Sequence, residues 1–137
     1  MKVYTIVIVE NDEDEQFFIG QSITETDLFQ ILAQVNEGGE LFAWLDEHKT
    51  TLPDLILSDL NMPGKNGYDV LAEIKNNPAY SHIPVIITST SSTRSTIEKC
   101  LSLGAADFIE KPDTFVDYGP FLKKLHQLVE EKNLLRK

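Results

Sequence analysis

The chain has 137 residues, of which 42% are hydrophobic, and this length and composition favour one folded domain over a disordered chain. The formal net charge is -10 and the isoelectric point is about 4.6, so the surface is acidic. An acidic surface argues against direct binding of nucleic acid, which needs a basic face, and against docking on anionic membranes.

The chain contains a single cysteine, Cys100, so no disulfide can form within it. We interpret Cys100 as a residue that packs a helix, because no histidine lies near it in the sequence to activate it as a nucleophile. The amino terminus leads directly into an apolar strand, and no apolar run reaches the roughly 20 residues of a membrane span. We expect a soluble, cytoplasmic protein with one domain over 1–137, a core of about 3–130, a tail of 132–137 and no output domain.

Short apolar runs that favour buried strands alternate with amphipathic segments that favour helices. The predicted strands are 4–9, 28–35, 55–58, 83–87 and 106–109. A turn is predicted at 36–39, and the last helix is expected to begin near Tyr118. The residues assigned to the apolar faces of the five helices are, in chain order, Phe17, Phe18, Ile19, Ile23; Leu41, Phe42, Leu45; Val70, Leu71, Ile74; Ile97, Leu101; and Phe121, Leu122, Leu125, Leu128, Val129.

Strands that alternate with helices imply parallel pairing through right-handed crossovers. Five such units predict an α/β fold of flavodoxin-like type, a doubly wound three-layer sandwich whose sheet has the strand order 2-1-3-4-5. In this order the first and third strands are neighbours, and the loops after strands one, three, four and five open at one edge. We therefore expect Glu10, Asp59, Ser89 and Lys111 to approach one another there.

Asp59 stands where the buried third strand ends, immediately before a turn marked by Pro63 and Gly64. Considered alone, it is better explained as a residue that starts a turn. A carboxylate at the carboxyl end of a parallel strand is also where open α/β sheets bind their ligands. The neighbouring loops decide between these interpretations.

Glu10 and Asp12 follow the first strand, so the topology brings several carboxylates to one edge, where they need a cation. Mg²⁺ prefers such oxygen ligands, and Lys111 after the fifth strand adds a fixed positive charge. Hydroxyl groups after the fourth strand come from Ser89 and Thr90. This set suits phosphoryl transfer with an aspartate as the covalent acceptor.

Four motifs in this order resemble those of the receiver domains of two-component response regulators. They are the acidic stretch after strand one, Ser-Asp-Leu-Asn-Met-Pro-Gly at 58–64, the Ser/Thr stretch after strand four and Lys-Pro at 111–112. The resemblance covers about 3–129 and is greatest to stand-alone receivers with a long loop after the third helix. It implies a switch that accepts a phosphoryl group from a histidine kinase or histidine phosphotransfer protein. Such a domain is not an enzyme beyond self-phosphotransfer and autodephosphorylation, and it signals through protein contact or phosphorelay.

The resemblance also implies a role for each matched residue. The phospho-acceptor would be Asp59. The Mg²⁺ site would comprise Glu10, Asn11, Asp59 and the backbone carbonyl of Asn61. The residues that contact the phosphoryl group would be Ser89, Thr90 and Lys111. The conformational switch would involve Ser89 and Phe108. A cis peptide bond is expected before Pro112, because bonds that precede proline make the cis form cheap.

Asn11 departs from the family pattern, which has an aspartate as a direct Mg²⁺ ligand at this position. An amide is a neutral and weaker ligand for a hard cation, so we predict weak Mg²⁺ binding, for which Asp12 could compensate. The alternative is a degenerate receiver that acts as a phosphorylation-independent binding module.

A flavodoxin-type electron carrier is disfavoured, because the acidic loop after strand one would repel a flavin phosphate. The three histidines, His48, His82 and His126, are interpreted as surface residues. Phe115, Val116 and Tyr118 either extend a face for partners or for a homodimer, or simply cover the core. The cognate kinase, the downstream partner and the oligomeric state are left open.

Overall fold

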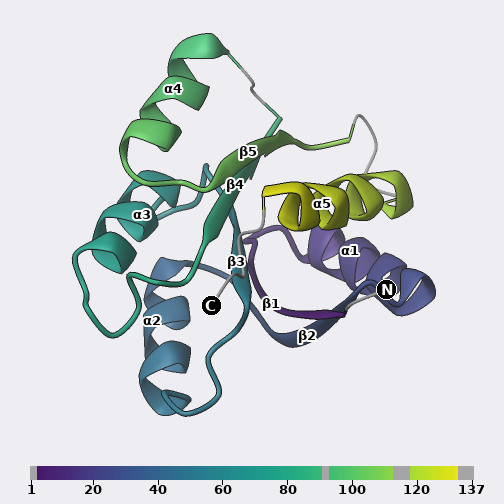
Figure 1. Cartoon of the computed structure of the whole chain (residues 1–137), viewed down its shortest axis with the longest axis horizontal. Coiled ribbons are helices and arrows are strands. Elements are labelled where there is room, and N and C mark those ends of the chain that lie inside the picture. The colour runs from purple at the N-terminus through teal and green to yellow at the C-terminus, as the bar shows by residue number, and fades with distance from the viewer. Residues whose placement is uncertain (1–2, 91–92, 113–117, 133–137) are drawn as a thin grey trace.

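The computed structural model describes residues 3–90, 93–112 and 118–132 of the chain. Within these residues five strands alternate with five helices, as Figure 1 shows. The strands are β1 (Tyr4–Val9), β2 (Phe29–Val35), β3 (Leu55–Asp59), β4 (Val85–Ser89) and β5 (Asp107–Glu110). The helices are α1 (Glu13–Thr26), α2 (Gly38–Glu47), α3 (Gly67–Lys75), α4 (Arg94–Ser102) and α5 (Gly119–Lys132).

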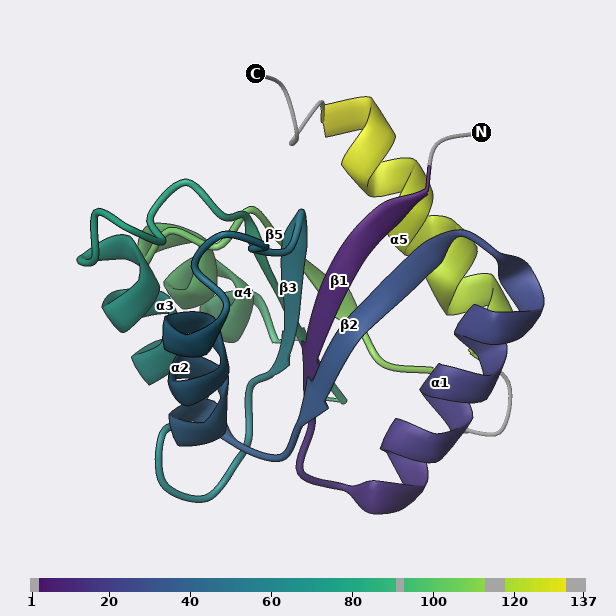
Figure 2. The same cartoon turned by 90° about the horizontal axis from the view of Figure 1, so that it is seen from below.

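The sheet is parallel throughout and has the order β2-β1-β3-β4-β5, which confirms the predicted topology. Figures 1 and 2 show α1 and α5 on one face of the sheet and α2, α3 and α4 on the other, so the fold has three layers. Because all five strands run in one direction, their carboxyl ends share one edge. The neighbours β1 and β3 connect onward to helices on opposite faces, which makes this edge the topological switch point.

The strands divide the apolar core into two parts, one on each face of the sheet. Leu55 and Leu57 of β3 belong to the core beneath α1 and α5, whereas Ile56 belongs to the core beneath α2, α3 and α4. All residues of β3 and β4 are buried. Burial on both faces explains why these strands appear in the sequence as continuous apolar runs without alternation.

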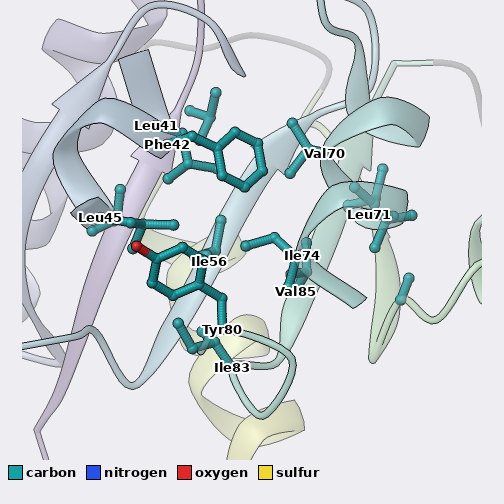
Figure 3. Packing of buried hydrophobic residues seen from close by; sticks show 14 of the residues in the cluster. Leu41, Phe42, Leu45, Ile56, Val70, Leu71, Ile74, Tyr80, Ile83 and Val85 are labelled. Atoms are coloured by element: carbon teal, nitrogen blue, oxygen red, sulfur yellow. The ribbon is translucent and has the colours of Figure 1, made fainter. Parts of the chain in front are cut away.

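The core beneath α2 and α3 includes one tyrosine among its aliphatic side chains. Figure 3 shows Leu41 and Phe42 of α2 facing Val70 of α3, with Tyr80 nearby. The Tyr80 side chain is 1% exposed, and its hydroxyl donates a hydrogen bond to the Asp46 carboxylate. A buried phenol needs such a partner, and this bond ties the segment before β4 to α2.

Two apolar residues that were assigned to helix faces in the core are exposed. Phe17 is 63% exposed, because the buried face of α1 is formed by Ile19 and Ile23, and Phe17 lies about 200° around the helix from Ile19. Leu101 is 45% exposed, because α4 turns the neighbouring Cys100 into the core instead. The interpretation of Cys100 as a packing residue is thereby confirmed.

The prediction that His126 lies at the surface is wrong. His126 is 5% exposed, and its ring lies 5.3 Å from the Tyr4 ring and 5.6 Å from the Phe29 ring, measured between centroids. It follows Leu122 by four residues on α5, which places both on the same side of the helix. The helical phase, rather than the polarity of imidazole, therefore determines its burial.

Several element boundaries differ from the prediction by one or two residues. β4 and β5 extend to Ser89 and Glu110, beyond the apolar residues that defined them in the sequence, because their ladder continues to the pair Ser89–Glu110. α2 begins at Gly38, inside the predicted turn, because the Glu37 side chain caps it by accepting a hydrogen bond from the Gly39 N–H. Phe115 and Val116 lie outside the described residues. No helix among the residues described is long and apolar enough to cross a membrane.

Candidate functional site

Glu10, Asp59 and Lys111 meet at the carboxyl edge of the sheet, as the topology predicts. Glu10 follows the last residue of β1, Asp59 is the last residue of β3, and each is 5% exposed. Lys111 follows β5, and its backbone N–H donates to the Ser89 carbonyl at 3.0 Å. This bond continues the pairing of β4 and β5 and directs the lysine toward the two carboxylates.

The Lys111 ammonium lies among three carboxylates. Its Nζ atom is 2.9 Å from Glu10 Oε1, 2.8 Å from Glu15 Oε2 and 3.4 Å from Asp59 Oδ1. The lysine side chain is 8% exposed, so these ion pairs are formed largely out of water. Among the described residues, three carboxylates against one ammonium leave a formal excess of two negative charges in a nearly buried place.

The pKa values of the cluster reflect this excess. Burial raises the pKa of the Glu10 carboxyl, and the Asp59 charge raises it further, while the hydrogen bond from Lys111 opposes both. Burial also raises the pKa of Asp59 against the opposing effects of Lys111 and the Asn61 N–H. Burial lowers the pKa of Lys111, but bonds to Glu15 and Glu10 outweigh it, so the net shift is upward and the ammonium stays charged. Burial is thus the main reason that Glu10 and Asp59 take up a proton more readily than usual, and the neighbouring carboxylates add to this effect.

The donor atoms at this edge fit a hard cation such as Mg²⁺. Glu10 and Asp59 offer carboxylate oxygens, and Mg²⁺ sites in proteins use one or two carboxylates together with waters and substrate oxygens. Asn61 lies in the loop immediately after β3, and its N–H points to Asp59 Oδ1 at 3.4 Å. The described residues contain no group of three or more His, Cys, Asp or Glu side chains arranged to hold a metal, so water and carbonyl oxygens would complete the coordination.

The two neighbouring polar residues after Glu10 do not take the place of a second acidic ligand. Asn11 is exposed, and its side chain has no hydrogen bond to any described residue. Asp12 is the N-cap of α1, where its Oδ1 accepts from the N–H groups of Asp14 at 2.9 Å and Glu15 at 3.1 Å. Using Asp12 as a metal ligand would cost this cap, which typically contributes about 1 kcal/mol.

The loops after β3 and β4 are joined by a direct side-chain contact. Asn61 Nδ2 donates to Ser89 Oγ at 3.3 Å, and Ser89 is fully buried while Thr90 is exposed. Phe108 of β5 pairs with Ile87 of β4. Its side chain is half-buried and packs against the core beneath α2, α3 and α4. Ser89 thus lies beside Asn61 at the carboxyl edge of the sheet. It follows Ile87, the residue that pairs with Phe108, by two positions on β4.

The expected cis bond before Pro112 is wrong, since the described residues contain no cis peptide bond. The trans form is the lower in energy by about 0.5–1 kcal/mol even before proline. No contact described at this position favours the other isomer.

Three residues of the site were not predicted. Glu15 of α1 lies 2.8 Å from Lys111 Nζ. Tyr118, the residue before α5, donates its hydroxyl proton to Glu15 Oε2 at 3.0 Å. The pattern Asp12–x–x–Glu15 signals a capping box, in which Glu15 would bond back to the cap, but its side chain instead extends to Lys111. Thr88 and these residues line a cavity of about 10 Å³.

Comparison with known proteins identifies relatives of the chain. A family model described as response regulator receiver domain matches residues 6–117. Two-component response regulator ORR8 of Oryza sativa subsp. indica is 43% identical over 70 residues, which cover 51% of this chain and 58% of that protein. The match thus spans little more than half of that relative.

Two solved structures have the same fold along nearly the whole chain. The phosphorylated cyanobacterial phytochrome response regulator RcpA is 31% identical with a TM-score of 0.72, and the alignment covers 95% of this chain and 91% of that chain. The Mn²⁺-bound form of response regulator Rcp1 is 27% identical with a TM-score of 0.73, and the alignment covers 98% and 96% of the two chains.

Proposed function

The chain belongs to the family of response regulator receiver domains, and on this basis we propose that it is a phosphorylation-controlled signalling switch with Asp59 as the acceptor. The observation that carries the proposal is the position of the Asp59 carboxylate, nearly buried at the end of β3 with Glu10 and Lys111 around it. Receiver domains are signalling modules rather than enzymes, so the donor and the recipient of the signal are other proteins.

The reaction we propose is transfer from a phosphohistidine of a histidine kinase or phosphotransfer protein. A carboxylate oxygen of Asp59 attacks phosphorus, the O–P bond forms and the N–P bond of the donor breaks. The electron pair of the broken bond stays on the imidazole nitrogen, which then takes up a proton. Hydrolysis reverses the state, because water attacks phosphorus, the carboxylate leaves and inorganic phosphate is released.

The residues around Asp59 would bind and orient the transferred group. Lys111 brings a fixed positive charge to phosphoryl oxygens, and it approaches Asp59 Oδ1 to 3.4 Å before any transfer. Ser89 would donate its hydroxyl proton to a phosphoryl oxygen, because in the bond from Asn61 Nδ2 its Oγ atom acts only as an acceptor. A bound Mg²⁺ would neutralise charge on the phosphoryl oxygens, and Glu10, Asp59 and the Asn61 carbonyl are the groups that would hold it. Two structural relatives support the proposed phosphorylation and the proposed metal site, since one is phosphorylated and the other is Mn²⁺-bound.

The signal would leave the site through Ser89 and Phe108. A phosphoryl group on Asp59 would accept a hydrogen bond from the Ser89 hydroxyl and draw Ser89 toward it, and β4 would transmit the change to the adjoining β5. This is a local change in charge that biases an element with two arrangements, and a partner protein would recognise the altered surface.

A second function is a binding module that works without phosphorylation. The observation in its favour is that Asn11 is neutral and exposed while Asp12 is engaged as a helix cap, so the second acidic ligand of the family has no substitute. In this case the chain would present one constitutive surface to its partner.

Incubation with acetyl phosphate and Mg²⁺, followed by intact-mass measurement, tests the proposal. We expect wild type to gain the mass of one phosphoryl group, and the Asp59→Asn variant to gain none. A gain that persists in Asp59→Asn would remove Asp59 from its role. An absence of any gain in wild type, with the Asn11→Asp variant becoming modified, would support the constitutive binding module.

A further inference from the structure

Among the described residues, Glu15 is the nearest carboxylate to Lys111, although it belongs to α1 rather than to the edge of the sheet. Its Oε2 lies 2.8 Å from Lys111 Nζ, compared with 3.4 Å from that nitrogen to Asp59 Oδ1. Charge-assisted N···O contacts usually measure about 2.7–2.9 Å, so Lys111 forms short ion pairs with Glu15 and Glu10 whereas its contact with Asp59 is long. Lys111 is therefore displaced toward Glu15 and away from the acceptor.

The Glu15 carboxylate is itself held in place. The Tyr118 hydroxyl donates to the same Oε2 at 3.0 Å, and the Tyr118 N–H donates to Ser22 Oγ on α1 at 3.2 Å. Tyr118 is 2% exposed and the Glu15 side chain is 14% exposed, so both bonds are largely shielded from water. Glu15 is thus fixed by its own helix on one side and by the start of α5 on the other.

Lys111 has three N–H donors and faces three carboxylates, of Glu10, Glu15 and Asp59. An acceptor oxygen of a new group on Asp59 would need one of these donors at a short distance. To shorten that contact, the ammonium must move toward Asp59 and lengthen its bond to Glu15. Of the contacts described for the Glu15 carboxylate, which is almost buried, the bond from Tyr118 would then remain.

Resting on the proposed function, we propose that Glu15 is a positioning residue that holds Lys111 away from Asp59 and so disfavours the phosphorylated state. Removing the charge of Glu15 releases Lys111 to the phosphoryl oxygens. The Glu15→Gln variant should accordingly bind a phosphoryl group, or an analogue of one, more tightly than wild type does. Glu15 does not touch the phosphoryl group and acts through Lys111.

The test is titration of the full chain with beryllofluoride, a stable phosphoryl analogue, at saturating Mg²⁺ so that metal affinity does not enter. We expect Glu15→Gln to bind it about fivefold or more tightly than wild type, at the lower end of typical coupling between sites. The matched control is Glu13→Gln, which removes the same charge from an exposed residue of the same helical turn and should leave affinity nearly unchanged.

The variant Glu15→Asp separates direct contact from a general effect of charge. It keeps the negative charge but is too short to reach Lys111 from the same backbone position, so it should shift affinity in the same direction as Glu15→Gln. Wild-type affinity in Glu15→Asp would overturn the proposed contact. Thermal unfolding of each variant verifies that it is folded.

A second readout needs neither metal nor phosphate. The ε-methylene resonance of Lys111, assigned by its loss in Lys111→Arg, should shift in metal-free Glu15→Gln and stay unchanged in Glu13→Gln. Equal affinities in Glu15→Gln and Glu13→Gln, or weaker binding in Glu15→Gln, would overturn the inference while leaving the proposed function intact. A wild type that takes neither beryllofluoride nor a phosphoryl group would overturn the proposed function, and the inference with it.

Discussion

Thr88 pairs with Asp59 across β3 and β4, yet its hydroxyl has no hydrogen-bond partner among the described residues of the protein. Thr88 is 5% exposed and its side chain reaches the same small cavity as Glu10 and Lys111. The ladder position directly beside Asp59 therefore carries a buried polar atom that no described residue satisfies, which costs free energy of folding.

Replacing this hydroxyl with a methyl group should stabilise the protein. Because valine has nearly the shape of threonine, Thr88→Val removes the unsatisfied oxygen without leaving a void, and we expect the free energy of unfolding to rise by about 1 kcal/mol. Urea denaturation of the metal-free protein measures this change. Thr88→Ser, which keeps the hydroxyl and loses the methyl group, should instead be less stable. A Thr88→Val variant that unfolds more easily than wild type would mean that the hydroxyl has a partner.

Asn11→Asp should strengthen Mg²⁺ binding by about tenfold, because a charged oxygen ligand replaces a neutral one beside Glu10 and Asp59. Calorimetric titration of the two proteins with Mg²⁺ measures the change. The control is Asp12→Asn, in which asparagine preserves the cap of α1 because the two residues cap helices equally well. If Asp12 acts only as a cap, this variant should bind Mg²⁺ almost as wild type does, and a large loss would identify Asp12 as a ligand.

Asp59→Asn should make the metal-free protein more stable by about 1–2 kcal/mol, because it removes one of three carboxylates that share a single ammonium in a nearly buried place. Thermal and urea unfolding without metal measure the gain. Addition of Mg²⁺ should then stabilise wild type more than Asp59→Asn, because the variant lacks a carboxylate that would bind the ion in the folded state.

The comparison for this prediction is Asp14→Asn, which neutralises an exposed carboxylate in the first turn of α1. This change should alter stability by less than about 0.5 kcal/mol. Equal effects of the two substitutions would show that a reduction of total charge, rather than the cluster around Lys111, is responsible.

Alkaline pH should weaken the core beneath α2 through Tyr80. Burial and the bond to Asp46 raise the pKa of the Tyr80 hydroxyl from 10.0 to about 12. Because the folded state holds this proton more tightly than the unfolded state, the stabilisation is complete below pH 10.0 and is lost as pH rises toward 12. Tyr80→Phe should lose about 1 kcal/mol at neutral pH and show a shallower fall in stability over that interval, measured by urea denaturation at several pH values.

Tyr118→Phe is a useful comparison, since burial and the Glu15 charge also raise the pKa of that hydroxyl. The alkaline fall in stability should therefore be reduced, and not abolished, by either substitution alone. A pH profile of Tyr80→Phe parallel to that of wild type would contradict the contribution of Tyr80.

Much of the fold could be predicted because it depends on local patterns. The apolar runs are buried on both faces, so they define the strands, and their alternation with helices determines the parallel order. That order alone brings Glu10, Asp59 and Lys111 to one edge, since the carboxyl ends of parallel strands coincide. The structure confirms this approach, whereas the chemical roles of these residues stay predictions.

The remaining features depend on the rotation of helices against the sheet, which periodicity determines only to within about one residue. Phe17 and Leu101 are exposed and His126 is buried because each helix turns a neighbouring position toward or away from the core. Likewise, the local Asp12–Glu15 pattern predicts a helix cap, and only the tertiary structure brings Lys111 within 2.8 Å of Glu15. The sequence by itself determined which charges share the edge of the sheet. The packing of α1 and the start of α5 against that edge decided which carboxylate binds the lysine most closely, because a contact between residues so distant in the chain exists only once the helices are docked.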